Sequence, residues 1–327
     1  MRRRLRDVGE HGWLRALLPR LNRGPRDPRV LIGPGDDAAV LRWGRGPIVL
    51  TTDTLVEGGH FRRGWLSPAA LGRRAYGVNA SDLAAMGATP VAALLALECP
   101  PDLPVRTIDG LVAGLVSAAR RHGARLVGGN VAAGPHLAIT VTLVGTTQGP
   151  LVRRAGARPG DLLCVSGRLG AVGYAVRERL AGRPARIPDP PDRVRLATAL
   201  APLAHAMIDV SDGLVQDLGH LCRASSVGAE VELARLPVAP SCRRAFGDHA
   251  AIFAATAGED HELLFAAPPR AAATLARLAA RTGCPITPIG RCVAGRAVVR
   301  LQDARGCRVR TPNGGFDHFV RPALYEQ

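Results

Sequence analysis

The chain contains no lysine, so all 43 of its basic residues are arginines, and they exceed the 27 acidic residues by 16. Aromatic residues are scarce too, at 4% of the sequence. An excess of positive charge favours nucleic acid, acidic membranes or phosphorylated small molecules as partners. The arginines are scattered, however, and so few rings offer no stacking platform for single-stranded nucleic acid. We therefore expect no specific nucleic-acid partner.

Long apolar runs and paired cysteines are also absent. No stretch reaches the roughly 18 apolar residues that a membrane-spanning helix needs. Charged residues between Arg6 and His11 interrupt the region behind Met1 where a signal peptide would be apolar. The seven cysteines form no CxxC pair, and an odd, dispersed set is typical of reduced thiols. These absences predict a cytoplasmic protein without membrane contact and without a structural zinc site.

Strand-like and helix-like runs alternate along the 327 residues, a length that suits two domains. Ser67 and Pro68 favour the start of a helix, and Gly87 favours its end. The pattern restarts near Gly149, so we predict a boundary at 148–152. The expected fold class is α/β (α+β), with one domain over residues 1–150 and a second over 151–327. The expected strands cover residues 47–50, 91–97, 137–144, 162–165, 205–210 and 262–265, and the expected helices cover 68–87, 107–123, 170–180, 214–223 and 270–281.

Acidic residues are few, yet several stand at the ends of apolar runs. Carboxylates gathered at strand ends would repel one another unless cations lay between them, and Mg²⁺ prefers such oxygen ligands while it bridges substrate phosphates. Any one of these residues taken alone is better explained as a helix cap or a turn residue. The whole set nevertheless favours a magnesium site. It comprises Asp36, Asp37, Asp53, Asp82, Asp209, Asp212, Glu259 and Asp260.

Two short segments favour phosphate binding. Gly128-Gly129-Asn130 follows a strand-like run over 125–127, and glycines there let backbone N–H groups approach an anion. Ser211-Asp212-Gly213 stands before an expected helix, whose N-terminus attracts negative charge. Each segment is weak evidence by itself. The chain lacks the GxxxxGKS/T pattern, which excludes a P-loop nucleotide site.

The order of the motifs along the chain is more specific than any one of them. The motifs are GPGDDAAV at 33–40, TTDTLVEGGHF at 51–61, VNASDLAAMGATP at 78–90, GGN at 128–130, RAGARPGD at 154–161, IDVSDGL at 208–214, GEDHEL at 258–263 and GFDHF at 315–319. This series resembles the thiamine-monophosphate kinase family, within the aminoimidazole ribonucleotide synthetase superfamily. The resemblance extends over nearly the whole chain, from about residue 8 to about residue 320.

The resemblance implies ATP-dependent phosphorylation of thiamine monophosphate to thiamine diphosphate. In the family, the γ-phosphoryl group passes directly to the substrate phosphate with the help of several Mg²⁺ ions, and no residue acts as a covalent nucleophile. Catalysis would then consist of positioning and charge neutralisation. The resemblance also implies a homodimer, an N-terminal α/β domain whose sheet dimerises into a barrel-like interface, and a C-terminal α+β domain that completes the cleft.

The resemblance further implies roles for residues of this chain. Magnesium ligands would be Asp37, Thr51, Thr52, Asp53, Asp82, Asn130, Asp209 and Asp212. Contacts with ATP would come from Gly129, Asn130, Arg154 and Ser211, and contacts with thiamine monophosphate from His60, Glu259 and Phe316. A carboxylate and an aromatic face suit a cationic thiazolium ring. Packing of His60 in its loop, and of Phe316 in the core, stays open as the alternative explanation of these two residues.

Asn130 departs from the family pattern, which usually has Asp at this position as a magnesium ligand. Asn keeps a carbonyl oxygen but loses the charge, so we expect weaker binding of one Mg²⁺ ion, which Asn130→Asp would restore. Two other enzymes of the superfamily fit less well. A selenophosphate synthetase needs a reactive Cys or selenocysteine in an N-terminal loop, whereas the first cysteine here is Cys99, and a hydrogenase-maturation relative needs a terminal cysteine. The remaining alternative is a weakened paralogue that acts on another phosphorylated substrate or only binds nucleotide.

Overall fold

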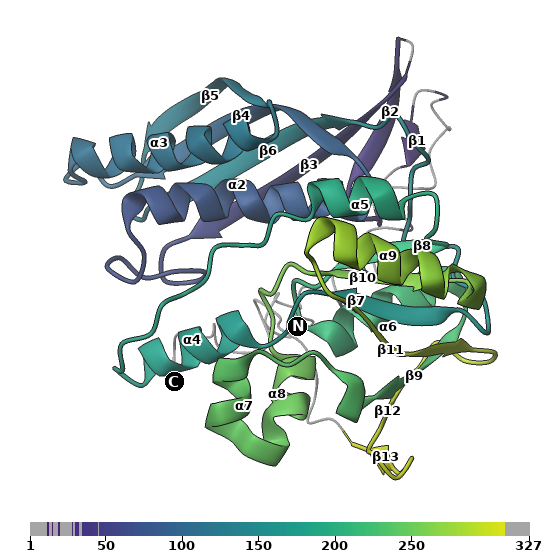
Figure 1. Cartoon of the computed structure of the whole chain (residues 1–327). Coiled ribbons are helices and arrows are strands. Elements are labelled where there is room, and N and C mark those ends of the chain that lie inside the picture. Colours follow the sequence, from purple (N-terminus) through teal and green to yellow (C-terminus); the bar gives the residue numbers. More distant parts are fainter. Residues whose placement is uncertain are drawn as a thin grey trace, which may run out of the picture.

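The computed structural model describes residues 12, 15, 19, 28, 30–32, 35–44 and 46–310. These residues form two β-sheets with helices packed against them, and Figure 1 shows the first sheet above the second. Phe316, which was expected to contact substrate, lies outside the described residues. Within the described part of the chain, no helix combines the length and the apolar character needed to cross a bilayer.

The first sheet has six strands in the order β1-β2-β3-β6-β4-β5. Only β4 and β5 are paired in parallel. Helices α2 and α3 cover one face of this sheet. The elements of this unit are β1 (Val30–Ile32), β2 (Ala39–Trp43), β3 (Gly46–Val56), α2 (Pro68–Ala85), β4 (Thr89–Cys99), α3 (Val105–Arg121), β5 (Arg125–Ala133) and β6 (Ala138–Thr146).

Strand alternation separates the two faces of the first sheet. Side chains on the helix side, such as Val49, Leu95 and Val141, are buried. On the opposite face, called the outer face below, Thr52 and Leu94 are exposed. A period of two is what a half-buried strand requires, because successive side chains point to opposite faces. Neighbouring residues of one strand therefore serve different surfaces.

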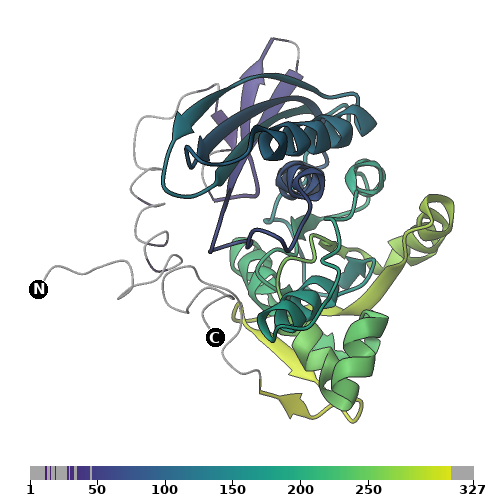
Figure 2. The same cartoon turned by 90° about the vertical axis from the view of Figure 1, so that its left-hand side faces the viewer.

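Helix α2 begins and ends where the sequence predicts. The Ser67 hydroxyl accepts a hydrogen bond from the Ala70 N–H at 3.2 Å, and Pro68 occupies the first turn. At the other end Gly87 adopts the left-handed conformation, with φ at 71°. Ala84 in the last turn is buried together with α5, α9 and strands of the second sheet. In Figure 2, α2 is seen along its axis, with the first sheet above it and the second unit below.

The second sheet has seven strands in the order β13-β12-β9-β11-β7-β10-β8. Strand β10 is buried along its whole length, because α5 and α9 cover one face of the sheet and α6 and α8 the other. The elements of this unit are β7 (Leu162–Ser166), α4 (Ala171–Leu180), α5 (Val194–Leu200), β8 (Ala206–Asp209), α6 (Leu214–Ser225), β9 (Gly228–Glu232), η1 (Leu233–Arg235), α7 (Pro240–Phe246), η2 (Gly247–His249), α8 (Ala250–Thr256), β10 (Leu263–Ala267), η3 (Pro269–Ala271), α9 (Ala272–Thr282), β11 (Ile286–Val293), β12 (Val299–Gln302) and β13 (Arg308–Val309).

The expected α/β (α+β) class is confirmed, and every strand and helix predicted from the sequence is present. One local expectation is wrong. Gly128, Gly129 and Asn130 do not form a loop after a strand, because β5 continues through them and pairs with β4. A Cβ atom on Gly129 would lie 1.8 Å from the Leu95 carbonyl oxygen, so glycine is required here for the close approach of a neighbouring strand.

Candidate functional site

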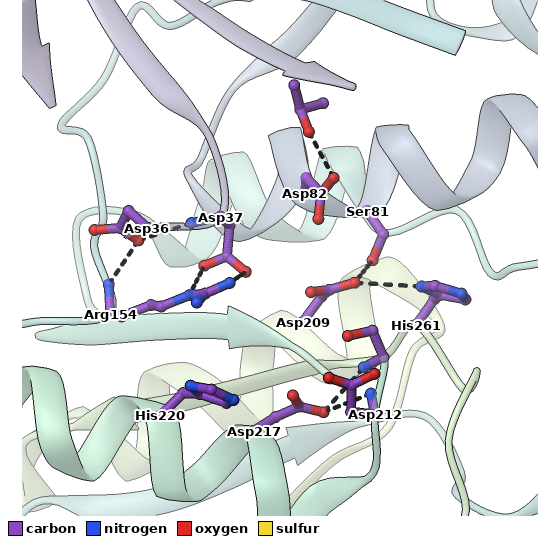
Figure 3. A network of polar contacts seen from close by, with 12 residues as sticks. Asp36, Asp37, Ser81, Asp82, Arg154, Asp209, Asp212, Asp217, His220 and His261 are labelled. Atoms are coloured by element: carbon purple, nitrogen blue, oxygen red, sulfur yellow. Dashed lines mark hydrogen bonds and ion pairs between the residues drawn. The ribbon is translucent and has the colours of Figure 1, made fainter. Parts of the chain in front are cut away.

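Three carboxylates from separate segments meet between the two sheets (Figure 3). Asp37 precedes β2, Asp82 lies in the last turn of α2, and Asp209 ends β8. Oxygen atoms of all three lie within 4.8 Å of one another. The sequence predicted that these residues share one site, and the structure brings them together. Three carboxylate oxygens at this spacing fit a hard cation such as Mg²⁺.

Arg154 holds Asp37 with both arms of its guanidinium group. Its Nε donates to Oδ2 of Asp37 at 3.0 Å, and its Nη2 donates to Oδ1 at 2.9 Å. The backbone N–H of Arg154 donates to Oδ1 of Asp36 at 3.1 Å. Together these bonds fasten the segment before β2 to the segment before β7. Arg154, expected to contact ATP, therefore lies directly beside the expected magnesium ligands.

Asp82 faces the middle of β3. The Thr51 hydroxyl donates to Oδ2 of Asp82 at 2.7 Å, and Asp53 follows on the same face of the strand. Loss of hydration raises the pKa of Asp82 well above its usual value, and the charges of Asp53, Asp209 and Asp37 raise it further. The carboxylates thus destabilise one another's charge, which is the condition that a bound cation relieves.

Asp209 is the best-partnered carboxylate of the group. The Ser81 hydroxyl donates to its Oδ2 at 2.7 Å, and Nδ1 of His261 lies 3.3 Å from the same oxygen. Burial by itself would raise the pKa of Asp209, but the hydrogen bond and the charge of His261 outweigh it and hold the pKa below its usual value. For Asp37, burial outweighs the opposing charge of Arg154 and raises the pKa to about 7.

Asp217 has a positioning role that the sequence did not reveal. Its Oδ2 accepts the backbone N–H groups of Ser211, Asp212 and Gly213 at 3.0, 3.1 and 3.1 Å. These are N–H groups that the sequence predicted for a phosphate, and in the structure Asp217 accepts all three. The contact of Ser211 with ATP stays a prediction. Asp217 lies in the first turn of α6 and is 3% exposed. A carboxylate at this helical position can reach back to the preceding loop, which was the available signal.

Asp212, an expected magnesium ligand, belongs to a second group of polar side chains (Figure 3). Single ligand atoms of Asp212, Asp217 and His220 lie within 4.8 Å of one another. The Gln216 amide donates to Oδ2 of Asp212 at 3.0 Å. Because the Asp217 carboxylate is already bonded to the loop backbone, this group serves first to order the loop that carries Ser211 and Asp212.

Besides Asp212, two more expected ligands do not join the group of Asp37, Asp82 and Asp209. Thr52 lies on the outer face of β3, where its hydroxyl shares a hydrogen bond of 2.9 Å with the Thr142 hydroxyl. Asn130 is exposed on the same face, opposite Ala96 of β4. Strand β5 is three strands from β3, which is about 14 Å at ordinary strand spacing. Both side chains point away from Asp82, and their roles as ligands stay predictions.

The two described residues expected at the substrate lie on loops beside this group. Glu259 pairs with Arg74 of α2, and its N–H donates to the Ser211 carbonyl at 2.6 Å. Burial would raise the pKa of Glu259, but the charges of Arg74, His261 and His60 hold it below its usual value. His60 accepts a hydrogen bond at Nδ1 from the Val56 N–H at 3.1 Å. An ionised carboxylate and an imidazole are therefore close enough to influence each other.

Comparison with known proteins identifies relatives over most of the chain. Two family models match, the N-terminal domain of AIR synthase related proteins over residues 35–147 and their C-terminal domain over residues 158–302. Thiamine-monophosphate kinase of Mycobacterium tuberculosis (strain H37Rv) is 39% identical over 80% of this chain and 81% of its own length. The enzyme of the same name from Escherichia coli (strain K12) is 36% identical over 90% of this chain and 93% of its own.

A solved structure has a similar fold. The structure of AaThiL complexed with AMPPCP and TMP superposes with a TM-score of 0.83 at 31% sequence identity, covering 98% of this chain and 100% of the other. The hydrogenase maturation protein HypE shares the fold at 22% identity and a TM-score of 0.69, covering 88% of this chain and 94% of the other. At that identity HypE supports the fold alone.

Proposed function

The chain belongs to the thiamine-monophosphate kinase family of AIR synthase related proteins, and from that membership we propose that it transfers the γ-phosphoryl group of ATP to thiamine monophosphate, giving thiamine diphosphate. The bound ligands of the similar AaThiL structure, AMPPCP and TMP, support this choice of substrates. No residue of the chain needs to form a covalent intermediate, since the acceptor phosphate itself attacks the γ-phosphorus.

The observation that carries the proposal is the group of Asp37, Asp82 and Asp209, whose oxygen atoms lie within 4.8 Å of one another. Joining two polyanions requires that their charges be neutralised and that the acceptor be held in line with the γ-phosphorus. Mg²⁺ held by these oxygens would supply the neutralisation when bound. We assign Asp53 and Thr51, which share a face of β3, to the same set of magnesium ligands. Asp212 joins the proposed ligand set by family analogy. The family pattern also implies Thr52 and Asn130, but both of these side chains lie on the outer face, away from Asp82.

The remaining groups would bind and orient the two substrates. Arg154, Ser211 and Gly129 are proposed contacts with ATP, and the forked guanidinium of Arg154 suits a phosphate oxygen pair. Glu259 and His60 are proposed contacts with thiamine monophosphate, together with Phe316. The negative charge that Glu259 keeps in its half-buried position suits a cationic thiazolium ring.

The proposal extends to domain roles and assembly. Residues 1–150 would bind ATP and magnesium and form the dimer interface, and residues 151–327 would complete the cleft. The outer face of the first sheet, on which Leu94 of β4 is 42% exposed, supports a homodimer formed through this sheet. The cysteines agree with a reducing, cytoplasmic location, because six of the seven are buried free thiols.

The test is a turnover assay with separate detection of ADP and thiamine diphosphate. We expect equal amounts of both products from ATP and thiamine monophosphate, a strict requirement for Mg²⁺, and little product from unphosphorylated thiamine. Other phosphorylated acceptors should be tested beside it. Binding of MgATP without formation of thiamine diphosphate would contradict the proposal and favour the weakened paralogue.

A further inference from the structure

Arg74 is a buried cation at the centre of α2 that none of the assignments above uses. Its side chain is 3% exposed. One end of its guanidinium group, Nη2, is paired with Oε2 of Glu259, and the other, Nη1, donates to the Pro188 carbonyl at 3.1 Å. A buried guanidinium group is costly unless its donors are satisfied. Arg74 thus joins three parts of the chain: α2, the connector before α5, and the loop before β10.

The loop at Glu259 needs such an anchor. Glu259 adopts the left-handed backbone conformation, with φ at 69°, which a residue with a side chain rarely takes. Its N–H donates to the Ser211 carbonyl at 2.6 Å, so the backbone is fixed to the loop that carries Asp212. The backbone therefore fixes the position of the Glu259 Cα atom, and Arg74 fixes the position of the Glu259 carboxylate.

The connector around Pro188 is itself seated on α2. Nε of Arg73 donates to Oδ2 of Asp189 at 2.6 Å, one residue beyond Pro188. One turn along the helix, a Cβ atom on Gly77 would lie 3.0 Å from Cβ of Pro190, so the ring of Pro190 lies against the bare helix backbone. The connector gives Arg74 a rigid second partner, which restricts the directions that its guanidinium group can take.

We propose that Arg74 is a positioning residue for the phosphate acceptor: it fixes the Glu259 carboxylate in the orientation that receives the cationic ring of thiamine monophosphate. This inference rests on the proposed function, in which Glu259 contacts that substrate. Arg74 does so from the first unit, so the α2 helix that carries Asp82 also sets the geometry of the acceptor side. Helix α2 would then hold the cation site and the acceptor site in a fixed position relative to each other.

The test compares KM for thiamine monophosphate, KM for ATP and kcat in three variants. Arg74→Met removes the charge and both hydrogen bonds at similar length, and should raise KM for thiamine monophosphate about 10- to 100-fold, the range expected for losing a hydrogen bond to a charged group. KM for ATP should change much less. Arg74→Lys keeps the charge but cannot hold both partners at once, and should restore part of the loss. Arg106→Met, the same change at an exposed position of α3, is the control and should leave KM near wild type.

A double-mutant cycle with Glu259→Gln shows whether Arg74 acts through Glu259. If it does, adding Arg74→Met to Glu259→Gln produces little further rise in KM. Independent, multiplying effects would overturn the inference, as would an unchanged KM in Arg74→Met while Glu259→Gln raises it. An unchanged KM in Glu259→Gln would instead refute the substrate role of Glu259, and absence of turnover in the wild type would refute the proposed function. Should Arg74→Met fail to fold, the same cycle is run with Arg74→Lys.

Discussion

Carboxylates withdrawn from water occur in two regions of the molecule, and their surroundings differ. Inside the second unit, Glu262 accepts both arms of Arg193 at 2.6 and 2.7 Å and the Ser166 hydroxyl at 2.5 Å. Between the two sheets, by contrast, Asp82 faces one hydroxyl and three other carboxylates.

The difference distinguishes carboxylates that stabilise the fold from carboxylates that are placed to bind a cation. A saturated carboxylate has already recovered the cost of leaving water, so removing it leaves its partners unsatisfied. A carboxylate that faces like charges destabilises the folded chain, and it is retained where a cation relieves the repulsion. Substitutions in the two regions should therefore have opposite signatures: loss of activity with the fold intact between the sheets, and loss of stability inside the second unit.

The largest expected effect is that of Asp82→Asn on turnover. The change removes a charge with almost no change in volume, so the fold should remain while kcat falls by on the order of 10³-fold or more. Turnover with thiamine monophosphate and the melting temperature would be measured together. Asp109→Asn, the same change at an exposed position of α3, is the control and should leave both unchanged. Wild-type turnover in Asp82→Asn would show that this group of carboxylates is not the catalytic cation site.

The second effect is on stability, through Glu262→Ala. This substitution leaves Arg193, whose side chain is 18% exposed, without its carboxylate partner. It should lower the free energy of unfolding by about 3 kcal/mol. Urea unfolding measures it. The control is Glu230→Ala, which breaks a pair with Arg291, a side chain that is 68% exposed, and should cost less than about 1 kcal/mol. Equal losses in the two variants would show that the saturated region is no more essential to the fold than the surface.

The smallest effect is expected for Asn130→Asp. The family pattern predicted that this change would lower the magnesium requirement, but the structure places residue 130 on the outer face of the first sheet, away from Asp82. We now expect the magnesium concentration for half-maximal rate to stay within about twofold of wild type, since exposed charges more than a Debye length apart are largely screened. A magnesium concentration for half-maximal rate several times lower in Asn130→Asp would indicate that residue 130 does contact the cation.

Much of this arrangement could be predicted from the sequence, because it depends on local rules. Ser67 and Pro68 mark the start of α2 by capping chemistry, and acidic residues at the ends of apolar runs pointed to Asp82 and Asp209 as members of one site. The expected strand-end position holds for Asp209 but not for Asp82, which lies in α2. The parts that could not be predicted depend on tertiary partners. The Gly128–Asn130 segment resembles a phosphate loop until β4 pairs with it, and Arg74 resembles any surface arginine until Glu259 closes over it.

The most direct test of the difference between the two regions is urea unfolding of the wild type and Asp82→Asn at pH 5 and pH 8, in EDTA and in Mg²⁺. The pKa of Asp37 is raised to about 7 and that of Asp82 is raised well above 3.8. The folded chain therefore holds protons that the unfolded chain has released. The contribution of these two groups to the free energy of unfolding falls as pH rises from about 4 to above 7.

The account predicts that in EDTA at pH 8 Asp82→Asn is more stable than the wild type, that this advantage shrinks at pH 5, and that Mg²⁺ stabilises the wild type more than the variant. The opposite result would contradict it: a variant less stable than the wild type in EDTA at pH 8, with an undiminished gain from Mg²⁺, would mean that Asp82 supports the fold as Glu262 does.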